Sequence, residues 1–200
     1  MRLVTGIIFG VLSCQVALAD SKQKPMICDD IRLIGEEAAL PSDKMESLCG
    51  IDNPVKVTEV AGVSLSQTLF VDCQAAVALA DLVEETIVPE AIAYFKEAPV
   101  TIGLGTGYQC RQRRDGVGKK ISQHALGMAV DIMSFEFAKK GVLTVEDGWR
   151  DRRRKDYKFL RRITDAGCGT FTTSLSPDTN AQHTDHMHFD MKKRKSPWCE

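Results

Sequence analysis

Aromatic residues are scarce in this sequence, net charge is almost absent, and long apolar runs are confined to the N-terminus. Aromatic residues make up 6% of the 200 residues, and the formal net charge is −1. So small a net charge gives no indication of nucleic acid or of an acidic partner. After the first twenty residues no segment is apolar and long enough to cross a membrane. The hydrophobic fraction of 44% suits one globular domain with extensions, and no repeat or linker divides it.

The sequence also lacks any Cys-x-x-Cys pair among its seven cysteines, which argues against a cysteine zinc site. Six of the cysteines are widely spaced after residue 20, and an even number in an exported chain predicts disulfides. The pairs that we expect are Cys49–Cys73, Cys110–Cys168 and Cys28–Cys199. The second pair would flank the candidate site described below, and the third would hold the two ends of the chain.

The first nineteen residues have the pattern of a signal peptide. A positive Arg2 precedes an apolar stretch over Leu3–Val16, and Ala17-Leu18-Ala19 fits a small-x-small cleavage site. Arg2 is the only charged residue that cleavage before Asp20 would remove. The remaining chain then has 25 Lys and Arg and 27 Asp and Glu, which gives a net charge of −2. A second interpretation takes Val11-Leu12-Ser13-Cys14 as a lipoprotein signal, with that cysteine lipidated. The first interpretation predicts a periplasmic or secreted protein, and the second a lipid-anchored one.

The first half of the remaining chain is predicted to be mainly helical. Short helices are expected around Met26–Ala39 and Ser42–Leu48, in a charged segment. Alternating residues over Val55–Val63 predict a strand. Apolar residues at steps of three and four over Leu69–Ala98 predict a long helix, which Pro89 divides.

Shorter elements follow in the second half. Strands are expected over Pro99–Gln109, Ala129–Met133, Thr170–Leu175 and His186–Met191, and a helix after Arg150–Lys155. This order predicts an α+β fold, with a small antiparallel sheet that carries the site, packs against helices and is held by disulfides. We assign residues 1–19 to a signal peptide, 20–48 to a helical N-terminal extension and 49–200 to the main domain.

Two motifs have a structural interpretation beside a functional one. Gly103, Gly105 and Gly107 could cradle a phosphate, but no helix start follows them, so we expect a turn. The basic run Arg150–Lys155 is typical of a solvated helix face, and docking on an anionic envelope surface is the alternative.

Histidines and carboxylates gather in two short segments. His124 lies seven residues before Asp131, and three of the four histidines lie in the segment His183-Thr-Asp185-His186-Met-His188. If His124, Asp131 and one later histidine converge, two imidazoles and one carboxylate leave a fourth metal position open, as in catalytic zinc sites. A turn at Gly127 would bring the first two together. His186 and His188 share a face of a strand, whereas Asp185 needs a bend to join them.

A resemblance narrows these alternatives. Ser122-x-His124-x-x-Gly127-x-Ala129-x-Asp131 resembles the signature of zinc D-Ala-D-Ala carboxypeptidases and dipeptidases, whose wider group includes lysostaphin-type peptidases and the hedgehog signalling domain. The chain is still more similar to the bacterial extensin-like C-terminal domain family. The matching segments include Cys49–Val55, Tyr108–Arg111, Ile121–Ala125, Ala129–Ile132, Phe159–Arg161, Cys168–Phe171, Leu175–Pro177 and His183–Met191.

The resemblance implies a role for each site residue. His124, Asp131 and His188 would be the ligands of one zinc ion. Asp185 corresponds to the general base, and His186 takes the position of a catalytic histidine in lysostaphin-like relatives. Arg111 would stabilise an oxyanion, with Arg113 or Arg114 as alternatives. Ser122 would bind substrate, and His183 is the expected bystander.

Export and the resemblance together imply a peptidoglycan peptide as substrate, hydrolysed near D-amino acids. Aspartate is one methylene shorter than the glutamate of the relatives, which puts the general base in doubt. The alternatives are a non-catalytic module that binds zinc or wall peptide, and a structural envelope protein without metal. No nucleic-acid partner is expected, and the sequence leaves the oligomeric state open.

Overall fold

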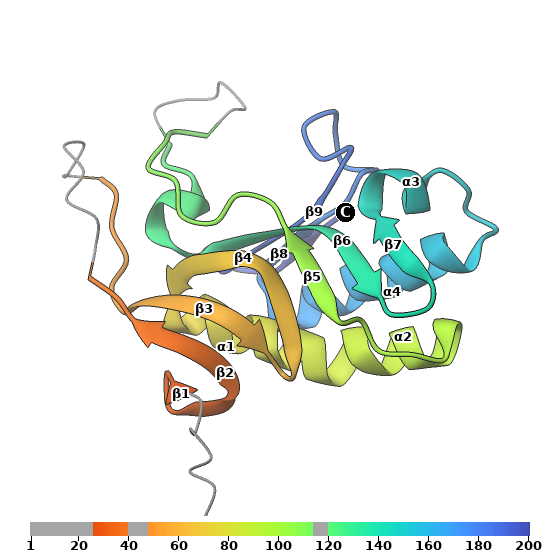
Figure 1. Cartoon of the computed structure of the whole chain (residues 1–200). Coiled ribbons are helices and arrows are strands. Elements are labelled where there is room, and N and C mark those ends of the chain that lie inside the picture. The colour runs from red at the N-terminus through yellow and green to blue at the C-terminus, as the bar shows by residue number, and fades with distance from the viewer. Residues whose placement is uncertain (1–25, 40–47, 114–119) are drawn as a thin grey trace, which may run out of the picture.

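The computed structural model describes residues 26–39, 48–113 and 120–200. The expected signal peptide, the expected helix over Ser42–Leu48 (apart from Leu48 itself) and Arg114 lie outside these residues. Within the described part of the chain, ten strands join in one sheet in the order β1-β2-β3-β4-β5-β6-β9-β8-β10, and β7 pairs with β6 (Figure 1). The strands are β1 (Met26–Ile27), β2 (Asp30–Glu37), β3 (Pro54–Val60), β4 (Val63–Asp72), β5 (Thr101–Leu104), β6 (Ala129–Phe137), β7 (Gly141–Thr144), β8 (Thr173–Leu175), β9 (Met187–Asp190) and β10 (Trp198–Cys199).

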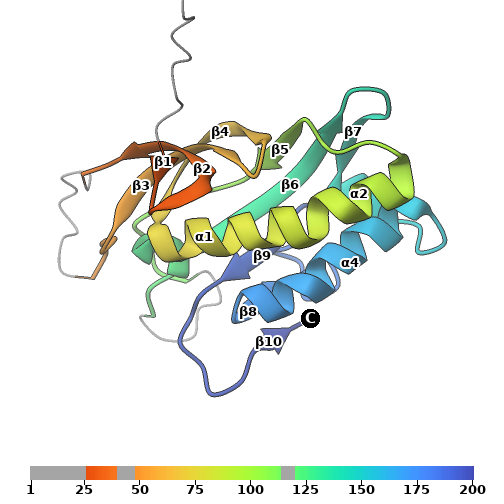
Figure 2. The same cartoon turned by 90° about the horizontal axis from the view of Figure 1, so that it is seen from below.

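Helices cover one face of this sheet. α1, η1 and α2 follow one another as a continuous rod, and α4 lies beside that rod (Figure 2). Their bounds are α1 (Cys73–Leu82), the π-helical η1 (Val83–Ile87), α2 (Val88–Phe95), the short α3 (Val145–Trp149) and α4 (Lys155–Thr170). The α+β class is therefore confirmed. The sheet is larger than expected and mixed, because parallel pairing of β4 with β5 joins the N-terminal strands to the strands of the site.

The core lies between the sheet and the helices. Alternate residues of β3 and β4 point into it, among them Val55, Val57 and Leu69, all at most 2% exposed. From α4, the Phe159 ring packs edge-on against Phe135 of β6, with ring centroids 5.2 Å apart. Side chains alternate along a strand, so the residues between these buried apolar ones point to the opposite face of the sheet, away from the helices.

The long helix begins later than the sequence predicts, at Cys73 instead of Leu69. Asp72 caps it, since its carboxylate accepts hydrogen bonds from the backbone N–H groups of Gln74 and Asn53, each at 2.8 Å. Pro89 lies in the first turn of α2 and is preceded by the π-helical turn η1. Proline cannot donate to a helical carbonyl, and the expected division of the helix takes the form of this wider turn.

The helix expected over Met26–Ala39 is wrong, because this segment forms the β1–β2 hairpin. Cys28 and Asp29 at its turn have φ of 57° and 54°, and two successive positive φ values are typical of a tight two-residue hairpin. Leu33 of β2 is fully buried, and β2 pairs with β3.

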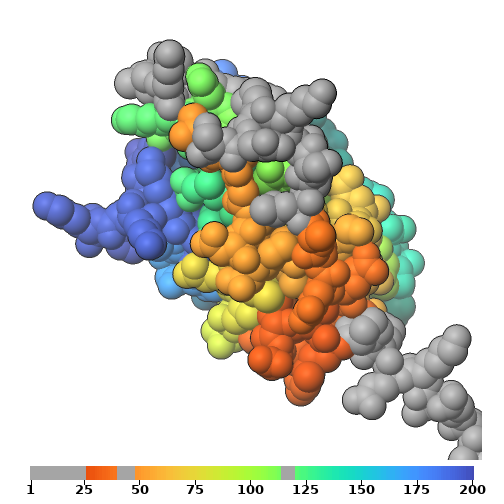
Figure 3. All heavy atoms as spheres, turned by 90° about the vertical axis from the view of Figure 1, so that its left-hand side faces the viewer, coloured from red at the N-terminus to blue at the C-terminus, as the bar shows by residue number. Residues whose placement is uncertain are grey.

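All three expected disulfides are also wrong. The bridges are Cys28–Cys73, Cys49–Cys110 and Cys168–Cys199, with Cα–Cα distances of 5.6, 5.6 and 5.7 Å. Cys28 and Cys199 cannot meet, because β1 and β10 are the two opposite ends of the strand order. Figure 3 shows the orange N-terminal strands and the blue C-terminal segment on different sides of the molecule. Cys28–Cys73 instead joins the β1–β2 turn to the start of α1, and Cys168–Cys199 joins α4 to β10.

Candidate metal centre

Two neighbouring strands place Asp131 and His188 side by side. In the antiparallel β6–β9 ladder these two residues are direct partners. Val130 and Ile132 of β6 and Phe189 of β9 are fully buried in the core. Because side chains alternate, Asp131 and His188 point to the opposite face of the sheet, away from α4.

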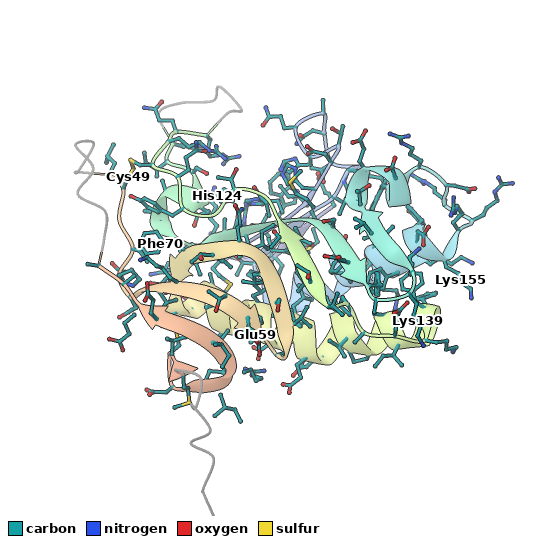
Figure 4. All side chains as sticks on the ribbon, in the orientation of Figure 1. Cys49, Glu59, Phe70, His124, Lys139 and Lys155 are labelled. Atoms are coloured by element: carbon teal, nitrogen blue, oxygen red, sulfur yellow. A yellow bond between two sulfur atoms is a disulfide. The ribbon has the colours of Figure 1, made fainter. Side chains whose placement is uncertain are left out.

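His124 reaches the same place from a short 3₁₀ helix, η2 (Gln123–Leu126), just before β6. Figure 4 shows its side chain on the face of the sheet away from α1 and α2. The chain turns at Gly127, with φ of 65°, as the sequence predicts. A Cβ atom at Gly127 would lie 2.7 Å from Cγ1 of Ile51 and 2.9 Å from the backbone N of Asp72. Glycine is therefore required here both by backbone conformation and by space.

The three side chains meet atom to atom. Nε2 of His124 lies 3.3 Å from Nδ1 of His188 and 3.3 Å from Oδ2 of Asp131. Nδ1 of His188 lies 2.8 Å from Oδ1 of Asp131. Two ligands on a tetrahedral zinc ion, each about 2.0–2.1 Å from the metal, are separated by roughly 3.3 Å. These three residues could therefore hold a metal ion. The two separations of 3.3 Å equal this value, and the third, at 2.8 Å, is shorter.

The outer nitrogen of each histidine has an acceptor. Nδ1 of His124 donates to the carbonyl oxygen of Gly107 at 2.9 Å, and Nε2 of His188 donates to Oδ2 of Asp190 at 3.1 Å. Because a carbonyl and a carboxylate accept, both outer nitrogens carry protons. The inner nitrogens face the centre, where Nδ1 of His188 also donates to Oδ1 of Asp131 as long as the ring is protonated. Such outer partners are the usual means of orienting metal-binding histidines.

Asp190 is a site residue that the sequence reasoning missed. It lies two residues after His188 on the same strand, so it shares the face of His188. The same two-residue spacing that places His186 and His188 on one face of a strand also places Asp190 there, so the sequence pattern could have identified it.

The centre attracts positive charge. Burial by itself lowers the pKa of His188, but hydrogen bonds to Asp131 and Asp190 outweigh it and raise that pKa to about 9. Burial raises the pKa of Asp131, yet its hydrogen bonds to His124 and His188 hold that pKa well below the usual range. Lone pairs of three ligands converge here, and they require a proton or a metal cation between them.

The glycine segment forms one wall of the site. A Cβ atom at Gly105 would lie 3.0 Å from Cβ of Asp131, and the Gly105 N–H donates to the Asp131 carbonyl at 2.9 Å. Gly107 supplies the acceptor for His124. No helix begins over residues 105–113, so the segment is not a phosphate-binding loop of that kind; the expected turn is not formed either, because Gly103 lies in β5 and Gly105 and Gly107 follow in an irregular segment. These glycines let backbone approach the ligands closely.

His186 and Asp185 form a pair at the edge of the centre. Nδ1 of His186 lies 2.7 Å from Oδ1 of Asp185, and its Nε2 lies 3.8 Å from Oδ1 of Asp131. The side chain of His186 is 18% exposed and that of Asp185 is 50% exposed. His186 therefore lies between the ligand group and Asp185, which is on the outside.

The fourth histidine, His183, is not remote. Its ring centroid lies 5.1 Å from that of His186 and 5.8 Å from that of His188, and its Nδ1 lies 2.9 Å from Oδ1 of Asn180. Burial and the neighbouring His188 and His186 lower its pKa to about 4. It lines the cleft but is not part of the three-ligand group.

Arg111 and Ser122 also meet at the cleft. The backbone N–H of Ser122 donates to the carbonyl of Arg111 at 3.1 Å, and both residues line a cavity of about 490 Å³ above the ligands. Nε of Arg111 donates to Oε1 of Gln109 at 2.9 Å. Arg113 lines the same cavity. A cavity of this volume suits a small peptide or a drug-sized molecule.

The basic run at Arg150–Lys155 gives no support to docking on an anionic surface. Its arginines pair with nearby carboxylates: Arg150 with Glu146 and Asp147, Arg152 with Asp178, Arg153 with Asp151, and Arg154 with Asp156. Much of its charge is therefore already neutralised within the chain.

None of the helices in the described residues has the length and apolar character needed to cross a membrane. Searches of the curated proteins and of the solved structures found no match. A family model described as "Extensin-like protein C-terminus" matches residues 31–200, which include every strand of the site. The chain belongs to this extensin-like C-terminal family.

Proposed function

We propose that the protein is an exported zinc-dependent peptidase that hydrolyses peptide bonds in peptidoglycan stem peptides or cross-links. The observation that carries this proposal is the convergence of His124, Asp131 and His188, whose outer ring nitrogens are held by Gly107 and Asp190 and whose inner nitrogens face the shared centre. Three disulfides support export, because such bonds persist in oxidising compartments. The resemblance of the Ser122–Asp131 segment to zinc carboxypeptidases supports the choice of a peptide substrate.

The donor set suits zinc. Two imidazoles and one carboxylate are ligands that zinc accepts, and three protein ligands leave a position for water or substrate. A zinc ion held there would lower the pKa of a bound water and polarise a substrate carbonyl.

The remaining residues of the cleft would handle the proton and the substrate. We assign the movement of the proton to Nε2 of His186, which faces the ligand group, and the orientation of that ring to Asp185, which holds Nδ1. Arg111 would stabilise negative charge on the carbonyl oxygen, and Ser122 would bind the peptide. Asp185 then acts through His186, as a positioning residue.

Two measurements test the proposal. Protein prepared without a histidine tag should contain about one equivalent of zinc by elemental analysis, and less than half an equivalent after exposure to zinc would contradict a zinc site. Muropeptides digested with this protein should give products that His188→Ala does not give. His183→Gln serves as the matched control, since it changes a histidine of the same cleft outside the ligand group. Full zinc content with identical product profiles for wild type and His188→Ala would point to a non-catalytic binding module.

A further inference from the structure

One end of the cleft is lined by cations. After His188 and Asp190, the chain leaves β9 through a basic segment, and Lys192 and Arg194 of this segment line the cavity together with Arg113. The segment is held in place on both sides. The carbonyl of Lys192 accepts a hydrogen bond from the hydroxyl of Thr172 at 2.7 Å, and β10 just beyond is fixed by the Cys168–Cys199 disulfide.

Arg194 has a fixed position at this end. Its Nε donates to the hydroxyl of Thr173 at 3.0 Å, and its guanidinium lies over the Trp198 ring, 5.0 Å from the centroid. These two contacts orient the planar guanidinium group. An arginine oriented in this way can form hydrogen bonds to an oxyanion with little loss of side-chain freedom.

Two of these cations, Lys192 and Arg194, lack a carboxylate partner in the described part of the chain: no carboxylate oxygen there lies within 4.0 Å of Nζ of Lys192 or of the guanidinium of Arg194. Elsewhere arginines do have such partners, among them Arg32, Arg161 and Arg162. Asp190, the nearby acid, is already engaged by His188 and by the backbone N–H of Lys192. Burial and the neighbouring Arg113 and Arg194 lower the pKa of Lys192 and outweigh the opposite effect of Asp190, so positive charge predominates at this end of the cleft.

We propose that Lys192 and Arg194, with Arg113 beside them, form a subsite for a carboxylate of the substrate. This inference rests on the proposed peptidase function for the identity of the ligand as a peptide. Lys192 and Arg194 follow the end of β9 and line the same cavity as the ligands, so this subsite would bind a carboxylate beside the reacting bond and not at it. The subsite would select acidic peptides and set their direction in the cleft.

The test compares one peptide in two forms. A stem peptide with free carboxylates and the same peptide with every carboxylate converted to a primary amide are titrated into the protein by calorimetry, with and without zinc. We expect the free-carboxylate form to bind at least about tenfold more tightly, because hydrogen bonds to charged groups are the stronger ones. The double variant Lys192→Gln, Arg194→Gln should reduce this ratio to below about threefold while zinc content and circular dichroism stay unchanged.

Two variants serve as controls. Arg153→Gln removes an exposed arginine that already pairs with Asp151, and it should leave the ratio unchanged. Arg194→Lys keeps the charge and should retain part of the preference.

Equal affinities for the two peptide forms, no detectable binding of either, or an unchanged ratio in the double variant would overturn the subsite. Displacement of bound peptide by inorganic phosphate is expected only at high concentration; phosphate binding without peptide binding would also overturn the assignment. A carboxylate preference without any turnover would contradict the peptidase but leave the subsite intact.

Discussion

Asp131 and His188 are direct partners across the β6–β9 ladder, and their facing atoms Oδ1 and Nδ1 are 2.8 Å apart. A shift of one residue in this register would turn both side chains toward the helices, because side chains alternate. The positions of these two candidate ligands are thus specified by the same backbone hydrogen bonds that build the middle of the sheet. His124 joins them through the turn at Gly127.

Asp190→Asn should weaken zinc binding by about 10- to 100-fold, because Asp190 holds the outer nitrogen of His188. The amide retains the size of the side chain but not its charge. Zinc affinity is measured by competition with a chromophoric chelator. Asp165→Asn, which removes a carboxylate paired with Arg161 on the surface of α4, should leave the affinity unchanged. Equal zinc affinity in Asp190→Asn and wild type would contradict the role given to Asp190.

The metal-free protein should lose stability as the pH rises from neutrality to above 9. The pKa of His188 is raised to about 9 in the folded protein from about 6.5 in an unfolded chain, so its contribution is complete below pH 6.5 and disappears as pH rises through 9. We expect a loss on the order of 2 kcal/mol in the free energy of unfolding, measured by urea denaturation in a chelator. His188→Gln should not show this loss, whereas His183→Gln should keep it. A wild-type free energy of unfolding that is constant over this range would refute the prediction.

Gly127→Ala should destabilise the protein by about 3 kcal/mol, which combines backbone strain with overpacking against Ile51. Gly141→Ala is the matched control, because Gly141 has φ of 82° but open space where Cβ would lie. That control should cost only the backbone term, about 1 kcal/mol. Thermal or urea denaturation separates the two, and equal losses would show that the contact with Ile51 has no effect.

Removal of the Cys168–Cys199 bridge by serine at both positions should lower the free energy of unfolding by about 3 kcal/mol, because the bridge closes a loop with a sequence separation of 31. Removal of Cys28–Cys73, at the opposite edge of the sheet, should cost a similar amount. Only the first change releases the segment of Lys192 and Arg194, so only it should reduce the preference for carboxylate peptides. An equal effect of both on that preference would contradict the placement of the subsite.

Patterns that are local in the sequence predicted structure well. The apolar periodicity identified α1 and α4, alternation identified β3, and the two histidine segments contained the three residues that converge. Gly127 was expected to turn the chain, and it does so with a positive φ. In each case the information lies within a few residues of the element it specifies.

Features that depend on distant segments were missed. The disulfide pairs follow from which strands lie at which edge, and the sequence alone does not show the strand order. The β1–β2 hairpin turns at Cys28 and Asp29, which have positive φ values but are not the glycine or asparagine that would predict such a turn. The places of Asp185 and His186 were left open because a bend before β9 decides which side chain faces the ligands. The role of Gly107 was missed because its carbonyl oxygen accepts a hydrogen bond from His124, which lies seventeen residues away in the sequence.

The separation of His124 from His188 by 64 residues has a consequence for how the protein would acquire a metal ion. Between them in the chain lie β6, β7, α3, α4 and β8, so the ligand set is complete only when β9 has inserted between β6 and β8. High zinc affinity would then require the complete sheet, and partly folded chains should bind zinc only weakly. Under the proposed function, metal binding would therefore follow the pairing of β9 with β6 and β8.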